Sequence, residues 1–173
     1  MLMNLRAPTT WLVALLAVLV AGSAAIGLTQ HAARGAAQQR LSAQLAWDTL
    51  ESRFHDRMAY AARGYTPFTA APGTPTPESE IRENQRVLED LAPHARAEID
   101  TFVSRLLALK TPDDAAREST LAMLIVNTRL AVLPPLSDQF ADRQRAADWT
   151  LLSTLGLAFG CGAMALWRTT RAG

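Results

Sequence analysis

The chain has 173 residues and a formal net charge of +1; 49% of its residues are hydrophobic and only 19% are charged. This apolar balance is unusual for a purely soluble protein, and a charge near zero argues against a nucleic-acid partner. The single cysteine, Cys161, excludes an intramolecular disulfide and a metal site built from several cysteines.

The first expected element is a transmembrane helix over residues 9–30, which follows a short tail of residues 1–8. The segment TTWLVALLAVLVAGSAAIGLTQ carries no charged residue, and about 20 such residues cross a bilayer as a helix. A cleaved signal peptide is the alternative, because Arg6 precedes the apolar run and AGSAA offers small residues for cleavage. The run is longer than the usual core of a signal peptide, so we favour an uncleaved anchor.

The chain is expected to continue as an amphipathic helix to residue 63. Apolar residues recur at steps of three and four, which places them on one helical face: Ala43, Trp47, Leu50, Phe54, Met58, Ala61 and Tyr65. Gly64 can take the left-handed conformation that ends a helix, and four prolines follow between residues 67 and 77. Thr76 as N-cap and Pro77 at the first helical position predict that the next helix starts there.

Two proline sites leave the helix order open in the rest of the central domain, residues 31–147. The main prediction is one helix from Pro77 to about Lys110, kinked at Pro93, with the apolar stripe Ile81, Leu88, Leu91, Ala95, Ile99, Phe102, Leu106 and Leu109. A third helix would then start at TPDD, residues 111–114, and end at Pro134-Pro135, and a fourth would run from Leu136 into the second span.

The alternative turns the chain at Pro93 and treats the double proline as a kink inside one helix. Both orders give four segments between two membrane crossings, and each segment has one apolar face to bury. We therefore predict an all-α protein, an antiparallel four-helix bundle between two transmembrane helices.

The second expected span covers residues 148–167, and a tail of residues 168–173 follows it. Trp149 and Trp167 stand about 27 Å apart in a helix and are typical of the two membrane interfaces. Gly156 and Gly160 form a G-x-x-x-G pattern, which lets helix backbones approach closely. We expect these glycines to pack against a second copy or against the first span, with incidental glycine as the alternative.

The sequence offers little for catalysis. Glu51 and His55 share a helical face and would make half a metal site, but a solvated surface pair explains them as well. Haem-attachment, phosphate-loop and nucleophile motifs do not occur in this sequence. We expect no enzyme activity, no cofactor and no metal site; a metal or haem binder through His55 and Met58 is kept as a hypothesis.

Arg63 and Tyr65 are the candidate ligand-binding residues. An arginine at a helix C-terminus stabilises the helix dipole without any ligand. Arg63 would otherwise tie the following loop to a neighbouring helix, or donate hydrogen bonds to an anion. The three interpretations stay open.

The segment ARGYTPFT, residues 62–69, resembles the R-G-Y-L-L-T-like signature of CHASE-type sensor domains, four-helix bundles of bacterial histidine kinases and chemoreceptors. Arg63, Gly64, Tyr65 and Thr69 match, whereas Pro67 replaces a leucine. LLALKTPDDAA, residues 106–116, is similar to the turn between the second and third helices of that family. The resemblance implies a sensory origin, although we expect no output module after the second span.

We therefore expect a sensory or regulatory protein of the bacterial inner membrane, which passes a signal through its transmembrane helices to a partner. The alternative is an accessory or structural subunit of a larger membrane complex. Both tails carry arginine and no acid, which favours two cytoplasmic termini and a periplasmic central domain. The expected partners are the lipid bilayer and either a second copy of the chain or another membrane protein.

Overall fold

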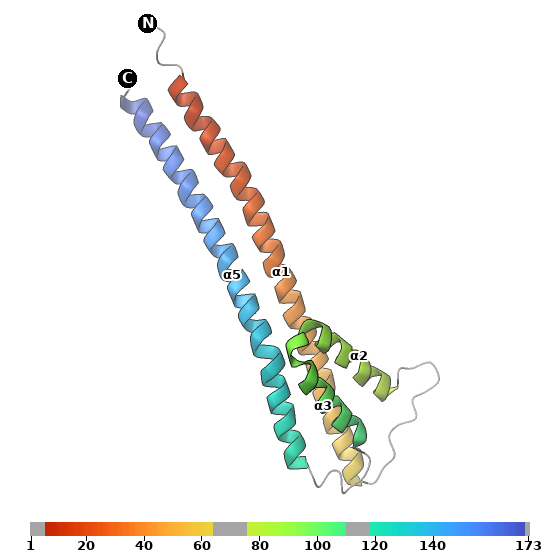
Figure 1. Ribbon diagram of the computed structural model, residues 1–173. Helices are drawn as coiled ribbons and strands as arrows, with labels where there is room; N and C mark the ends of the chain where they lie inside the picture. Colours follow the sequence, from red (N-terminus) through yellow and green to blue (C-terminus); the bar gives the residue numbers. More distant parts are fainter. Residues whose placement is uncertain (1–5, 64–75, 110–117, 172–173) are drawn as a thin grey trace. The chain divides into compact units, whose positions relative to one another are not determined.

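The structure is a computed structural model that describes residues 6–63, 76–109 and 118–171. The described residues form helices α1 (Arg6–Arg63), α2 (Pro77–Leu91), α3 (Arg96–Ala108) and α5 (Glu118–Arg171), with a short 3-10 turn, η1 (Pro93–Ala95), between α2 and α3 (Figure 1). The prediction of an all-α protein is confirmed for this part of the chain.

The chain divides into two compact units. We call Ala37–Gln139 the core unit, and Met1–Ala36 together with Phe140–Gly173 the terminal unit. Helices α1 and α5 are each continuous from one unit into the other.

The helix end before the proline-rich stretch and the helix start after it both agree with the sequence signals. Helix α1 ends at Arg63, directly before Gly64, whose own conformation lies outside the described residues. Helix α2 begins at Pro77, and the Thr76 hydroxyl accepts a hydrogen bond of 3.1 Å from the Ser79 backbone N–H. The N-cap prediction is therefore confirmed.

The chain turns at Pro93, so the main prediction of one kinked helix through this proline is wrong. Helix α2 ends at Leu91, and Ala92 leaves the helical region with φ −131° and ψ 64°. A residue before proline disfavours the helical conformation, since the proline ring clashes with its backbone. After η1, α3 runs back beside α2 (Figure 1). The TPDD start signal lies outside the described residues.

Helix α5 passes through Pro134 and Pro135 without interruption, so the predicted break at the double proline is also wrong and the alternative order is the correct one. Two features offset the lost backbone hydrogen bonds. Val132 and Leu136, on either side of the prolines, are buried in the core. His94, in the turn between α2 and α3, hydrogen-bonds the Ala131 carbonyl, which Pro135 leaves without its helical donor.

The core unit encloses one apolar cluster to which all four helices contribute. Its members include Trp47, Leu50, Phe54, Ile81, Leu88, Ile99, Phe102, Leu106, Ile125, Val132 and Leu136. The Trp47 and Phe102 rings lie 5.5 Å apart between centroids, within the range of favourable aromatic pairs. The predicted stripe of α1 is confirmed from Ala43 to Met58, and the Ala61 side chain and Tyr65 lie outside the description.

In the terminal unit, α1 and α5 come into close contact at Gly22 and Thr154. A Cβ atom added to Gly22 would overlap the Thr154 methyl group, whereas a Cβ at Gly27 would meet no atom within 4 Å. Gly22 is therefore required by packing, because any larger residue separates the two helices.

We predict that Gly22→Ala destabilises the helix pair by about 1–3 kcal/mol, the usual effect of overpacking. Gly27→Ala is the matched control and should stay within about 0.5 kcal/mol. The measurement is SDS-induced unfolding of the protein in mild detergent, followed by circular dichroism.

The partner residue supplies a rescue for this prediction. Thr154→Ala removes the methyl group that a Cβ at position 22 would meet, so it should restore most of the stability lost in Gly22→Ala. Equal stability of the two glycine variants, or no rescue by Thr154→Ala, would contradict the packing described for Gly22.

Candidate functional site

Two arginines of α1 meet the first turn of α2 inside the core unit. Arg53 and Arg57 are one helical turn apart, and Glu78 and Glu80 lie in the first turn of α2. Acidic residues are favoured there because the N-terminus of a helix carries partial positive charge. We call these four residues, together with the last carbonyls of α3, the arginine junction.

Arg53 makes the shorter contacts of the junction. Its Nε and Nη2 atoms donate to Glu80 Oε2 over 2.9 and 2.5 Å, and its Nη1 atom pairs with Asp56 at 3.2 Å. The hydrogen bond to Glu80 raises the pKa of Arg53 above its ordinary value. The Arg53 side chain therefore remains a cation over the whole pH range in which proteins fold.

Arg57 is the buried member of the junction and touches three helices. Its side chain is only 8% exposed, and its Nη2 atom lies 3.0 Å from Glu78 Oε1. Its Nη1 atom donates to the Leu106 and Leu107 carbonyls over 3.3 and 3.0 Å. These carbonyls belong to the last turn of α3, where a cation is favoured; the Leu106 carbonyl also accepts a hydrogen bond of 3.4 Å from the Leu109 backbone N–H.

A second polar cluster ties α2 to α3. The buried Gln85 amide nitrogen donates to Glu89 Oε1 over 2.6 Å and to Asp100 Oδ1 over 2.5 Å. Arg82 Nη1 donates to the Gln85 oxygen, and Arg96 pairs with Glu89 at 3.3 Å. A buried amide costs free energy unless its hydrogen bonds are made, so this cluster favours one relative position of α2 and α3.

The residues that the sequence singled out lie elsewhere. Arg63 is exposed at the last position of α1, and Tyr65 lies outside the described residues, so their ligand role stays a prediction. Glu51 accepts a hydrogen bond from Trp47 Nε1 over 3.1 Å and pairs with Arg129 at 3.8 Å. His55 is exposed on α1.

Gly156 and Gly160 face open space on α5, with no atom within 4 Å of an added Cβ. The close approach between α1 and α5 involves Gly22 and Thr154 instead. A packing role for Gly156 and Gly160 against a second copy stays a prediction.

Sequence reasoning missed Arg57, although the sequence holds a signal for it. Arg57 lies between Phe54 and Met58, on the face that the apolar stripe assigns to the core. A charged residue on a buried face needs partners of opposite charge or free carbonyls. The acidic first turn of the next helix, which contains Glu78, holds one of these partners.

We predict that Arg57→Ala lowers the free energy of unfolding of the core unit by about 2–3 kcal/mol, because charged hydrogen bonds to buried carbonyls are lost. Arg57→Lys keeps the charge but not the forked donor geometry, so its free energy of unfolding should lie between those of the wild type and Arg57→Ala. Arg129→Ala is the control within the core unit: the half-exposed Arg129 pairs with Glu51 at 3.8 Å, and pairs at the surface contribute less than about 1 kcal/mol. Denaturant unfolding followed by circular dichroism measures all three variants, and equal losses in Arg57→Ala and Arg129→Ala would contradict this role.

Comparison with known proteins adds no family to this description. No protein-family model, curated protein or solved structure matches the chain. The resemblance of residues 62–69 to CHASE-type sensor domains therefore remains a prediction.

Proposed function

We propose that this chain is a membrane-anchored sensory or regulatory protein, which passes a signal from its core unit through its transmembrane helices to a partner. The observation that carries the proposal is the continuity of α5. This one helix contributes Ile125, Val132 and Leu136 to the core and extends to Arg171 through the apolar segment 148–167. A shift or rotation of a packed helix of about 1–2 Å is a common way to transmit a signal.

The apolar surface of the terminal unit supports the proposed membrane anchor. Helices α1 and α5 are both long and apolar enough to cross a bilayer, and the most apolar window of each is entirely unburied. Large apolar side chains point outward there, among them Leu12, Val13, Leu16, Val20, Leu28, Leu152, Leu155, Leu157, Phe159 and Leu166. An apolar surface of this extent is unfavourable in water and favourable in lipid.

The arginine side chains at one end of the terminal unit support the placement of both termini on the same side of the membrane. The Arg168 guanidinium carbon lies 5.5 Å from the Trp11 ring centre, and that of Arg171 lies 4.3 Å from the Trp167 ring centre. Arginine beside tryptophan is favourable at a membrane interface, where the ring lies among the headgroups and the charge reaches water. We propose that this end faces the cytoplasm of a bacterial inner membrane, with the core unit as a periplasmic antiparallel bundle.

The partner would bind in the membrane. Gly156 and Gly160 are open to their surroundings, and glycines at this spacing allow a second helix to approach closely. A second copy of the chain or another membrane protein fits this face.

A second candidate function is an accessory subunit of a larger complex. It is favoured by an apolar stripe on α5 within the core unit, where Met123, Val126 and Leu130 are 68%, 55% and 61% exposed. Exposed apolar surface outside the membrane is typical of a stable docking face.

Photo-crosslinking in living cells distinguishes the two candidates. We predict that a photoreactive amino acid at exposed Phe159 of the second span captures a second copy or one membrane protein, in a yield that changes with growth conditions. An accessory subunit would instead be captured at Val126, in a constant yield, and would stay in a stoichiometric complex in mild detergent.

The control position for this experiment is Arg143, which is exposed on α5 but belongs to neither apolar surface. Capture at Arg143 as strong as at Phe159 would show that crosslinking is unspecific. Absence of any protein captured at Phe159 in all growth conditions would rule out signalling through a partner of the second span.

A further inference from the structure

The double proline of α5 removes two backbone donors from the middle of a helix. Pro134 and Pro135 carry no N–H group, so the carbonyls four residues earlier, those of Leu130 and Ala131, lose their helical partners. The Leu130 side chain and Pro134 are exposed, so water reaches that side of the helix. Ala131 and Pro135 are half-buried, and an unpaired carbonyl there is costly.

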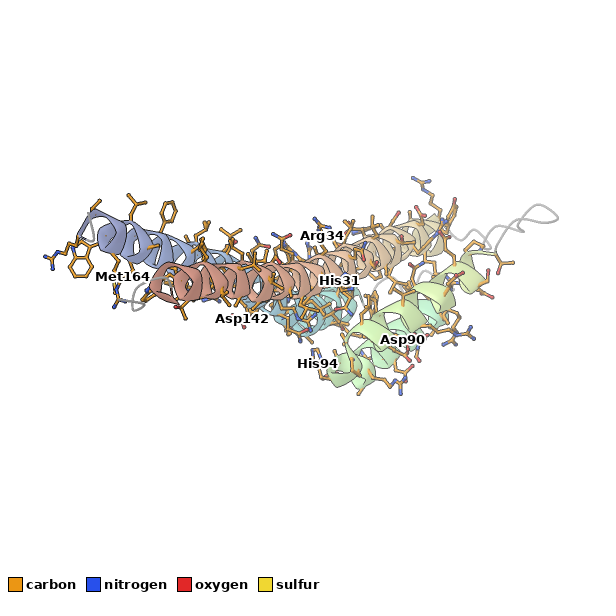
Figure 2. The ribbon with its side chains drawn as sticks, turned by 90° about the horizontal axis from the view of Figure 1, so that it is seen from above. His31, Arg34, Asp90, His94, Asp142 and Met164 are labelled. Atoms are coloured by element: carbon orange, nitrogen blue, oxygen red, sulfur yellow. The ribbon has the colours of Figure 1, made fainter. Side chains whose placement is uncertain are left out.

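The turn between α2 and α3 supplies the missing donor. His94, in η1, has its Nε2 atom 3.0 Å from the Ala131 carbonyl oxygen, and Figure 2 labels its side chain at this turn. A carbonyl can only accept, so Nε2 carries the proton. The neighbouring residues Ala92 and Ala95 are buried in the same core as Val132 and Leu136, which fixes the turn against this part of α5.

We propose that the turn between α2 and α3 holds α5 continuous at Pro134 and Pro135 through the hydrogen bond from His94 to Ala131. We call this contact the clasp. When His94 donates this hydrogen bond, the Ala131 carbonyl has a donor and α5 stays continuous. Without the bond from His94, α5 lacks two backbone hydrogen bonds at Pro134 and Pro135. This segment then becomes the weakest point of the helix, and helices that contain proline kink at such points. The clasp makes the conformation of α5 depend on the position of the α2–α3 pair.

The clasp also gives the proposed signal a route, and this part of the inference rests on the proposed function. A ligand or partner that displaces the α2–α3 pair would withdraw His94 from Ala131. The helix would then relax at Pro134 and Pro135, between the core residues Val132 and Leu136, and the change would reach the second span along α5. The clasp itself is a property of the purified chain and holds whether or not the chain signals.

Hydrogen exchange of the full-length protein in lipid nanodiscs tests the clasp. We expect amides of residues 131–144 to exchange roughly fivefold faster in His94→Ala than in the wild type, the effect of losing one hydrogen bond. His55→Ala is the matched control, because His55 is an exposed histidine of α1, and it should leave these amides unchanged. Peptides of α1 within residues 41–58 report any general loosening, which would raise exchange there as well.

The decisive comparison is a double-mutant cycle with Pro135→Ala, which returns an N–H group to position 135. In that background the Ala131 carbonyl has its own helical donor, so His94→Ala should no longer speed exchange at residues 131–144. His94→Gln, whose amide can donate, should recover part of the protection.

Three results would overturn the clasp: no difference between His94→Ala and His55→Ala, an equal effect of His94→Ala in the Pro135→Ala background, or faster exchange in α1 to the same degree. Because the assay uses purified protein without a partner, its failure leaves the crosslinking test of the proposed function untouched.

Discussion

The continuity of α5 depends on the contacts that compensate for the backbone hydrogen bonds lost at Pro134 and Pro135. A proline inside a helix costs about 3 kcal/mol or more, because a backbone bond is lost and the ring clashes with the preceding turn. Helix α5 nevertheless runs unbroken from Glu118 to Arg171. Burial of Val132 and Leu136 and the bond from His94 to Ala131 stabilise this region. The core residues of α5 and the second apolar segment are therefore parts of one helix.

The other helices of the core unit are held by polar groups as well as by apolar packing. Arg57 joins α1 to the first turn of α2 and the last turn of α3. Gln85 joins α2 to α3 through its hydrogen bond to Asp100, and Glu89 does so through its ion pair with Arg96. Apolar burial is not directional, whereas these hydrogen bonds have fixed partners, so they favour one arrangement of the three helices. The position of His94 follows from that arrangement, since it lies in the turn between α2 and α3.

Much of the fold could be predicted from local signals. The end of α1 at Arg63, the Thr76 N-cap and the apolar stripes follow from capping and periodicity, which depend on neighbours along the chain. Whether the chain turns at Pro93 or at Pro134-Pro135 does not follow from such local signals. Both sites carry a local cost, and a histidine 37 positions away in sequence contributes to keeping α5 continuous at the second. For the same reason the role of Arg57 and the pairing of Gly22 with Thr154 escaped prediction, because the partners are distant in sequence.

Backbone NMR of the protein in lipid nanodiscs tests the central claim, that α5 is one helix from the core to the second apolar segment. The measurement is the set of Cα and carbonyl secondary chemical shifts from residue 125 to residue 152. We predict helical shifts throughout, with the Ala131 carbonyl shifted as a hydrogen-bonded acceptor. Several consecutive non-helical shifts at residues 131–137 would contradict the claim, because they would separate the core from the second apolar segment.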